Sequence, residues 1–211
     1  MNRSLIIAVC ILTTSTLIGQ EFEGKIIYKN TYESNTKGVS DNQLNSLMGT
    51  IQEYVIKGGN YKSSVNGSFN QYQLYRSEEN RIYNKFSNAE ALFWSDASIE
   101  GEKILSIDVK EDQETILGVS CDKLIMKTTK GSYIYFYSSK YPINPTLFRE
   151  HIFGNWYEFV KRAKSVPLKI IMNTLEFKSI SVAIKLESLE VDSSFFDIPE
   201  LPLKPISELR N

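Results

Sequence analysis

The stretch 166-VPLKIIMNTLEFKSISVAIKLESLEV-191 decides the fold class of this chain. In its second half, apolar residues recur at every other position: Ile180, Val182, Ile184 and Leu186. This period of two is typical of a half-buried β-strand, because successive side chains point to opposite faces of a sheet. The stretch therefore predicts a long pair of strands, with these four side chains on one face as part of an apolar wall.

The same alternation extends outward from this pair through most of the chain, beginning with EFEGKIIYKNTY (21–32). Gly58-Gly59 and Lys130-Gly131 interrupt such runs with dipeptides suited to tight hairpins. The acidic run KEDQE (110–114) predicts a further turn. About eleven short strands are expected, at the regular spacing of an antiparallel sheet or open barrel. The predicted fold class is mainly β, with minor α content.

Two segments break the alternation and predict short helices. SDNQLNSLM (40–48) begins with a capping box formed by Ser40 and Gln43. In NPTLFREHIFGNWYEFVKRAKS (144–165), Asn144 and Pro145 are suited to a helix start, and Gly154 is expected to divide the segment into two helices. The segment is amphipathic, and its expected ligand-facing residues are Leu147, Phe148, Phe153, Trp156 and Phe159.

The N-terminus has the layout of a secretory signal peptide over residues 1–20, MNRSLIIAVCILTTSTLIGQ. Arg3 precedes an apolar run, Leu5 to Leu12, and a small residue, Gly19, lies near the expected cleavage site. The apolar run is shorter than the ~20 residues of a transmembrane helix. Cys10 lies inside the apolar run, which argues against lipoprotein processing. The mature protein is therefore expected to be periplasmic or secreted, without a lipid or transmembrane anchor.

Residues 21–211 are expected to form a single domain, because about 190 residues suit one core and no linker interrupts them. The tail FFDIPELPLKPISELRN (195–211) carries three prolines and is expected to be extended and peripheral. Removing Arg3 with the signal leaves 23 basic against 25 acidic residues, a net charge of −2. This balanced charge argues against nucleic acid as a partner, because phosphate binding needs a concentrated basic patch.

Cys121 is the only cysteine of the mature chain and His151 is the only histidine. A cysteine nucleophile needs a neighbouring base, so these two residues define the one conceivable Cys/His hydrolase. A free cysteine is more often a small buried core residue, which favours a packing role over a nucleophile or an exposed, dimer-bridging thiol. No metal-ligand spacing occurs, and no metal, cofactor or catalytic residue is expected.

Four segments, taken in order, resemble a known family: FEGKIIYK (22–29), ETILGVSCDKLIMKT (114–128), SVPLKIIM (165–172) and EVDSSFFDIP (190–199). They are similar to an exported domain of uncharacterised function from Bacteroidetes-type bacteria, which is related to the LolA/LolB lipoprotein-carrier superfamily. This resemblance implies a half-open antiparallel β-barrel or curved sheet of about eleven strands, with two or three short helices capping its concave side. It also implies binding of a lipid or lipoprotein acyl chain without catalysis.

The expected function is that of an exported, non-enzymatic binding protein. An apolar or lipid-like ligand would lie beneath the 144–163 helices, between the five aromatic and aliphatic residues of that segment and the wall of Ile180, Val182, Ile184 and Leu186. The alternative is an envelope structural or assembly protein that binds another protein through a sheet edge or an aromatic patch. A Cys121/His151 hydrolase is the third alternative. A packed interior beneath the helices would favour the second of these over the first.

Overall fold

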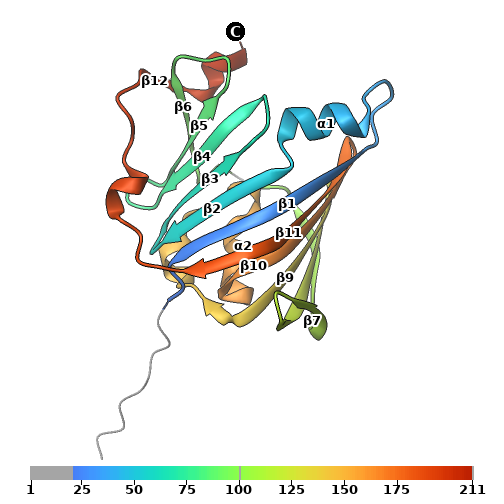
Figure 1. Ribbon diagram of the computed structural model, residues 1–211. Coiled ribbons are helices and arrows are strands. Elements are labelled where there is room, and N and C mark those ends of the chain that lie inside the picture. Colours follow the sequence, from blue (N-terminus) through green and yellow to red (C-terminus); the bar gives the residue numbers. More distant parts are fainter. Residues whose placement is uncertain (1–20, 100, 211) are drawn as a thin grey trace, which may run out of the picture.

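A computed structural model describes residues 21–99 and 101–210 of the chain, so the expected signal peptide lies outside the described residues. Within these residues, twelve strands form one curved, mostly antiparallel sheet that does not close into a barrel (Figure 1). The strands are β1 (Gly24–Ser34), β2 (Ile51–Lys57), β3 (Asn60–Val65), β4 (Asn70–Arg76), β5 (Arg81–Phe86), β6 (Leu92–Asp96), β7 (Ile104–Ile116), β8 (Val119–Thr128), β9 (Gly131–Pro142), β10 (Ser165–Thr174), β11 (Phe177–Ser188) and β12 (Leu203–Pro205). The predicted fold class, a mainly β curved sheet, is confirmed.

The strand order is β12-β6-β5-β4-β3-β2-β1-β11-β10-β9-β8-β7. Two meanders, β1 to β6 and β7 to β11, meet where β1 pairs with β11 in the middle of the sheet. The neighbouring strands pair antiparallel except β12, which pairs parallel with β6. The sheet therefore ends at β7 on one side and at β12 on the other.

The hairpins expected at Gly58-Gly59, at Lys130-Gly131 and between 166 and 191 are confirmed. The turn expected at KEDQE (110–114) is wrong. β7 continues through this run to Ile116, with a register shift between Lys110 and Glu114. The chain turns instead at Leu117-Gly118, whose positive φ angles of 51° and 76° suit a tight hairpin. A bulge rich in acidic residues thus resembles a turn in sequence.

A second register shift, between β1 and β11, changes the face of the sheet on which residues of the 166–191 segment lie. We call the face of the sheet on which α2 lies the inner face. Leu186 is opposite Ile26 on this face and Lys185 is opposite Ile27, but the register shifts between Ile27 and Tyr28. Ala183 is therefore opposite Tyr28, and Val182 is opposite the exposed Lys29.

The expectation that Ile180, Val182, Ile184 and Leu186 share one face is consequently wrong. Leu186 lies on the inner face, while Ile180 and Val182 lie on the outer face. Ile184 is the extra residue at the shift and is 51% exposed. A bulge inserts one residue without changing the sequence alternation, so the pattern continues while the faces exchange.

Both predicted helical segments are confirmed. Helix α1 (Asp41–Met48) begins with the capping box of Ser40 and Gln43. Residues 144–163, which we call the helical cap, form the 3₁₀ turns η1 (Pro145–Phe148) and η2 (Phe153–Asn155) and helix α2 (Trp156–Ala163). Asn144 caps η1 with its side chain, and Gly154 adopts a φ of 63° that interrupts the helix. Figure 1 shows α2 within the curve of the sheet.

The C-terminal tail is more integrated than expected. After β11, the 3₁₀ turn η3 (Ser193–Phe196) buries Phe196, and β12 extends the sheet before η4 (Ile206–Arg210). Val191 and Phe196 pack with Val55, Leu74 and Tyr83 in a second core on the outer face of β2, β4 and β5. The prolines keep the tail extended, but its apolar residues attach it to the sheet.

Candidate functional site

Aromatic rings fill the space between the helical cap and the inner face. Tyr54, Tyr61 and Tyr75 stand on β2, β3 and β4, with successive ring centroids 5.3 Å apart. They share one face because Tyr61 is directly opposite Tyr75, and Tyr54 lies two residues from Ile56, the partner of Tyr61. From the other half of the sheet, Tyr135 of β9 stacks on Phe159 of α2 at 4.2 Å. The cap is thus held between the two halves of the curved sheet.

The cap contributes its own rings to this cluster. Phe148 stacks near Tyr75, with centroids 6.1 Å apart, and Trp156 lies 5.4 Å from Phe159. Phe148 and Phe159 are fully buried. Burying such side chains contributes about 1.5–3 kcal/mol each to folding. The interior beneath the cap is therefore packed with side chains in this structure.

Three buried polar atoms in and beside this cluster, Tyr54 Oη, Trp156 Nε1 and His151 Nδ1, have no hydrogen-bond partner among the described residues. Burial raises the pKa of Tyr54 well above its ordinary value, and the neighbouring Tyr61 and Tyr28 add to this effect. A buried polar atom without a partner costs about 1–3 kcal/mol. The packed state of the cap therefore leaves three hydrogen-bonding atoms without a partner.

His151 connects the cap to the tyrosine row. Its Nε2 lies 2.9 Å from Tyr61 Oη, and its ring centroid lies 4.2 Å from that of Tyr75. Burial lowers the pKa of His151 to about 4, so the imidazole is neutral at physiological pH. Its contacts indicate a structural role at the junction of η1 and η2.

The structure brings together only some of the residues expected to face a ligand. Phe148, Trp156 and Phe159 meet beneath the cap, whereas Leu147 and Phe153 are 39% and 43% exposed. Of the expected wall, Leu186 lies on the inner face, and Ile180, Val182 and Ile184 do not join it. Whether any of these residues binds a ligand stays a prediction.

The inner-face tyrosines Tyr54, Tyr61, Tyr75 and Tyr135 were not among the residues expected at the site. Each belongs to an alternating run, so its strand was predictable. Whether these tyrosines contact one another depends on the order of the strands and on the direction in which the sheet curves, and one sequence does not reveal either. The signal that could have identified them is a tyrosine on the same face of three consecutive strands.

Cys121 and His151 are both buried but engage other groups. Cys121 is fully buried at the start of β8, with Sγ 3.6 Å from the carbonyl oxygen of Val119. Burial raises the pKa of its thiol, which disfavours the nucleophilic thiolate. His151 meets Tyr61. Among the described residues, no cluster of three or more potential metal ligands occurs.

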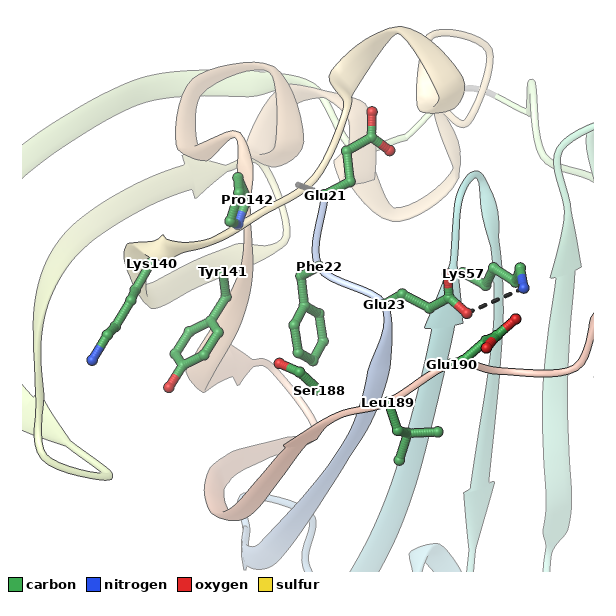
Figure 2. A pocket seen from close by; sticks show the side chains of 10 residues that line it. All are labelled: Glu21, Phe22, Glu23, Lys57, Lys140, Tyr141, Pro142, Ser188, Leu189 and Glu190. Atoms are coloured by element: carbon green, nitrogen blue, oxygen red, sulfur yellow. Dashed lines mark ion pairs between the residues drawn. The ribbon is translucent and has the colours of Figure 1, made fainter. Parts of the chain in front are cut away.

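A separate cleft of about 630 Å³ lies where β1 begins and where β2, β9 and β11 end (Figure 2). Phe22 and Tyr141 meet edge to face in it, with centroids 5.6 Å apart. Glu23 pairs with Lys57 at 3.1 Å and also accepts a hydrogen bond from the backbone N–H of Val191. Its lining residues are Glu21, Phe22, Glu23, Lys57, Lys140, Tyr141, Pro142, Ser188, Leu189 and Glu190. The ion pair joins the residue before β1 to the end of β2, and the hydrogen bond joins it to the segment after β11, so Glu23 forms a structural connection.

Comparisons with known proteins identify the fold without a family. No family model matches the sequence, and no curated protein matches it. Among solved structures, the chain is similar to PNGF-II, determined in a C2 space group, with 12% identity and a TM-score of 0.50. The match covers 90% of this chain and 32% of that chain, so this chain spans about a third of the length of PNGF-II. A likeness at this identity shows the fold alone. Among the described residues, no helix is long and apolar enough to cross a membrane.

Proposed function

We propose that this chain is an exported, non-enzymatic binding protein that holds an apolar, lipid-like ligand on its inner face beneath the helical cap. The observation that carries the proposal is the aromatic cluster with three unpartnered polar atoms, Tyr54 Oη, Trp156 Nε1 and His151 Nδ1. An apolar ligand with one hydrogen-bonding head would take the place of cap rings on the inner face and supply a partner to Tyr54 Oη, while movement of the cap would give Trp156 Nε1 access to water. The packed structure then represents the closed, ligand-free state.

The chain has suitable points about which the cap could move. Gly154 and Asn155 precede α2 with φ angles of 63° and 57°, and Lys164 follows it with a φ of 48°. Helix α2 is therefore bounded at both ends by left-handed residues, where the chain direction changes. Rotation at these points would move Trp156 and Phe159 together, because both belong to the same short helix.

Two measurements test the proposal. Native mass spectrometry after gentle extraction should show a co-purifying lipid, and the purified protein should take up a fluorescent fatty acid.

In a Trp94→Phe variant, Trp156 is the remaining tryptophan, and its emission should change on uptake because it lies in the cluster. In the matched Trp156→Phe variant, Trp94, which stacks on Arg81 at 4.1 Å, should report no change. Failure of lipid to co-purify together with failure of uptake would exclude this function.

A second candidate is an envelope protein that binds another protein, and the outer face favours it. Ile125, Ile134, Ile171 and Ile180 lie opposite one another on β8, β9, β10 and β11 and form a half-buried apolar stripe. The packed interior beneath the cap favours this candidate, because a lipid carrier requires the cap to open before a ligand can enter. An Ile171→Glu variant should then lose capture of the partner in cross-linking of intact cells, while its fatty-acid uptake stays unchanged.

Export itself is part of the proposal and rests on residues 1–20. N-terminal sequencing of the protein from a cell-envelope or culture fraction should begin within a residue or two of Glu21. A protein that retains Met1 in the cytoplasm would contradict export and, with it, both envelope functions.

A further inference from the structure

The inner face continues beyond the aromatic cluster toward α1, and there it changes character. One uncharged polar side chain stands on each of six adjacent strands. We call these residues the polar belt: Ser181 on β11, Asn30 on β1, Gln52 on β2, Ser63 on β3, Gln73 on β4 and Asn84 on β5. Cross-strand pairing places them on the inner face, since Asn30 is opposite Ser181, Ser63 is opposite Gln73 and Gln73 is opposite Asn84.

Charged side chains are segregated from the belt. Lys29, Glu53, Lys62 and Lys85 occupy the same strands, but each is adjacent in sequence to an inner-face residue and therefore points to the outer face. The inner face of these six strands carries amides, hydroxyls, tyrosines and aliphatic groups, without a formal charge among the residues placed there. An anionic or cationic ligand would find no opposite charge on this surface.

The belt residues hold one another in place while keeping hydrogen-bonding capacity. Gln52 Nε2 donates to Ser63 Oγ at 2.8 Å, and Gln73 Nε2 donates to Asn84 Oδ1 at 3.2 Å. Each primary amide has two N–H donors and an oxygen with two lone pairs. These bonds therefore use only part of the hydrogen-bonding capacity of each amide. Gln52, Ser63, Gln73 and Asn84 are half-buried, and Asn30 Oδ1 is buried without a hydrogen-bond partner among the described residues.

Aromatic rings border the belt on the same face. Tyr32 lies opposite Ser179 on the neighbouring strand, and Tyr61 donates to Gln73 Oε1 at 3.4 Å. Across the sheet, Tyr133 lies opposite Met172, which is itself opposite Ser179. Tyrosines offer both an apolar ring and a hydroxyl. The belt therefore combines flat apolar surfaces with neutral donors and acceptors.

We propose that the polar belt binds a neutral saccharide. Sugar hydroxyls both donate and accept hydrogen bonds, as the amides do, and the C–H faces of a sugar ring pack on aromatic rings. A lipid chain would leave the remaining donors and acceptors of the belt amides unsatisfied, and a charged ligand would lose its solvation without compensation. The proposal stands independently of the apolar ligand beneath the helical cap.

Isothermal titration of the mature chain with chitotetraose, maltotetraose and mannotetraose tests this site, with tetragalacturonate as the charged comparison. At least one neutral oligosaccharide should bind, and tetragalacturonate should not. Gln52→Ala and Gln73→Ala should each weaken binding by about two- to tenfold, the effect of one hydrogen bond. Glu53→Ala and Ser64→Ala alter the same region of β2 and β3 on the opposite face and should leave affinity unchanged.

A measurement on the unaltered protein guards against variants that do not fold. In ¹⁵N-correlated spectra, saccharide should shift the side-chain amide signals of Gln52, Gln73 and Asn84, while that of Gln113, on the exposed edge strand β7, stays in place. The proposal is overturned if none of the three neutral oligosaccharides binds, if only tetragalacturonate binds, or if the control substitutions weaken binding as much as the belt substitutions.

Discussion

The single histidine is the residue through which pH should act most directly on this fold. His151 is buried against Tyr61 and Tyr75, and burial lowers its pKa from 6.5 to about 4. Between these values the unfolded chain binds a proton that the folded chain does not, so stability falls as pH falls through this window.

The expected loss between pH 7 and pH 5 is about 2 kcal/mol, from 1.36 kcal/mol per pH unit below 6.5. Urea unfolding at several pH values measures it. This range lies above the ordinary pKa values of Asp and Glu, so the histidine dominates the slope. A His151→Gln variant should be less stable at pH 7 but should lose this slope. A slope unchanged in the variant would assign the pH dependence to other groups.

Cys121 should behave as a packing residue. Its side chain is fully buried, and the pKa of its thiol is raised by that burial. Ellman's reagent should therefore react very slowly with the native protein and rapidly once urea unfolds it. Rapid stoichiometric labelling of the native protein would instead identify an accessible, reactive thiol.

At the scale of elements, the end of α2 offers a test of local backbone geometry. Lys164 follows the helix with a φ of 48°, a conformation that glycine adopts with less strain. Lys164→Gly should therefore stabilise the protein by up to about 1 kcal/mol. Lys161→Gly, inside α2, should destabilise it by about 1 kcal/mol. Thermal unfolding of the two variants should show shifts of opposite sign.

The elements also show where sequence reasoning succeeds and where it fails. Strands, hairpin glycines and the capping box of Ser40 were predictable because their causes are local. The faces of Ile180 and Leu186 were not, because a bulge opposite Ile27 and Tyr28 exchanges them without altering the alternation. The turn predicted at the acidic run after Lys110 was wrong because this run forms a bulge within β7, and bulges and turns contain similar residues.

Across the molecule, the C-terminal tail links the centre of the sheet, at β11, to one of its ends, where β12 pairs with β6. Phe196 is 3% exposed in the second core, whereas its neighbour Phe195 is 38% exposed. Phe196→Ala should cost about 3–5 kcal/mol, the range for large-to-small changes in a core. Phe195→Ala should cost about 1 kcal/mol or less. Equal effects in denaturant unfolding would show that the tail is not part of the cooperative core.

The candidate site was less predictable than the fold. The sequence indicated the amphipathic segment that supplies Phe148, Trp156 and Phe159, because helical periodicity is local. The tyrosine row and the polar belt come from strands far apart in the chain, and their meeting depends on strand order. Strand order is a property of the assembled sheet, so one sequence without related sequences does not determine it.

The pairing of β1 with β11 also determines how late in the folding of the chain the sheet can be completed. Gly24 lies opposite Ser188, so the central strand gains its second neighbour only when nearly the whole chain is available. Contacts between such distant residues form slowly, because loop closure costs entropy. A chain synthesised N-terminus first exposes one edge of β1 until residue 188 has been made. Open strand edges pair readily with other chains, so the incomplete protein should depend on a chaperone far more than the finished one does.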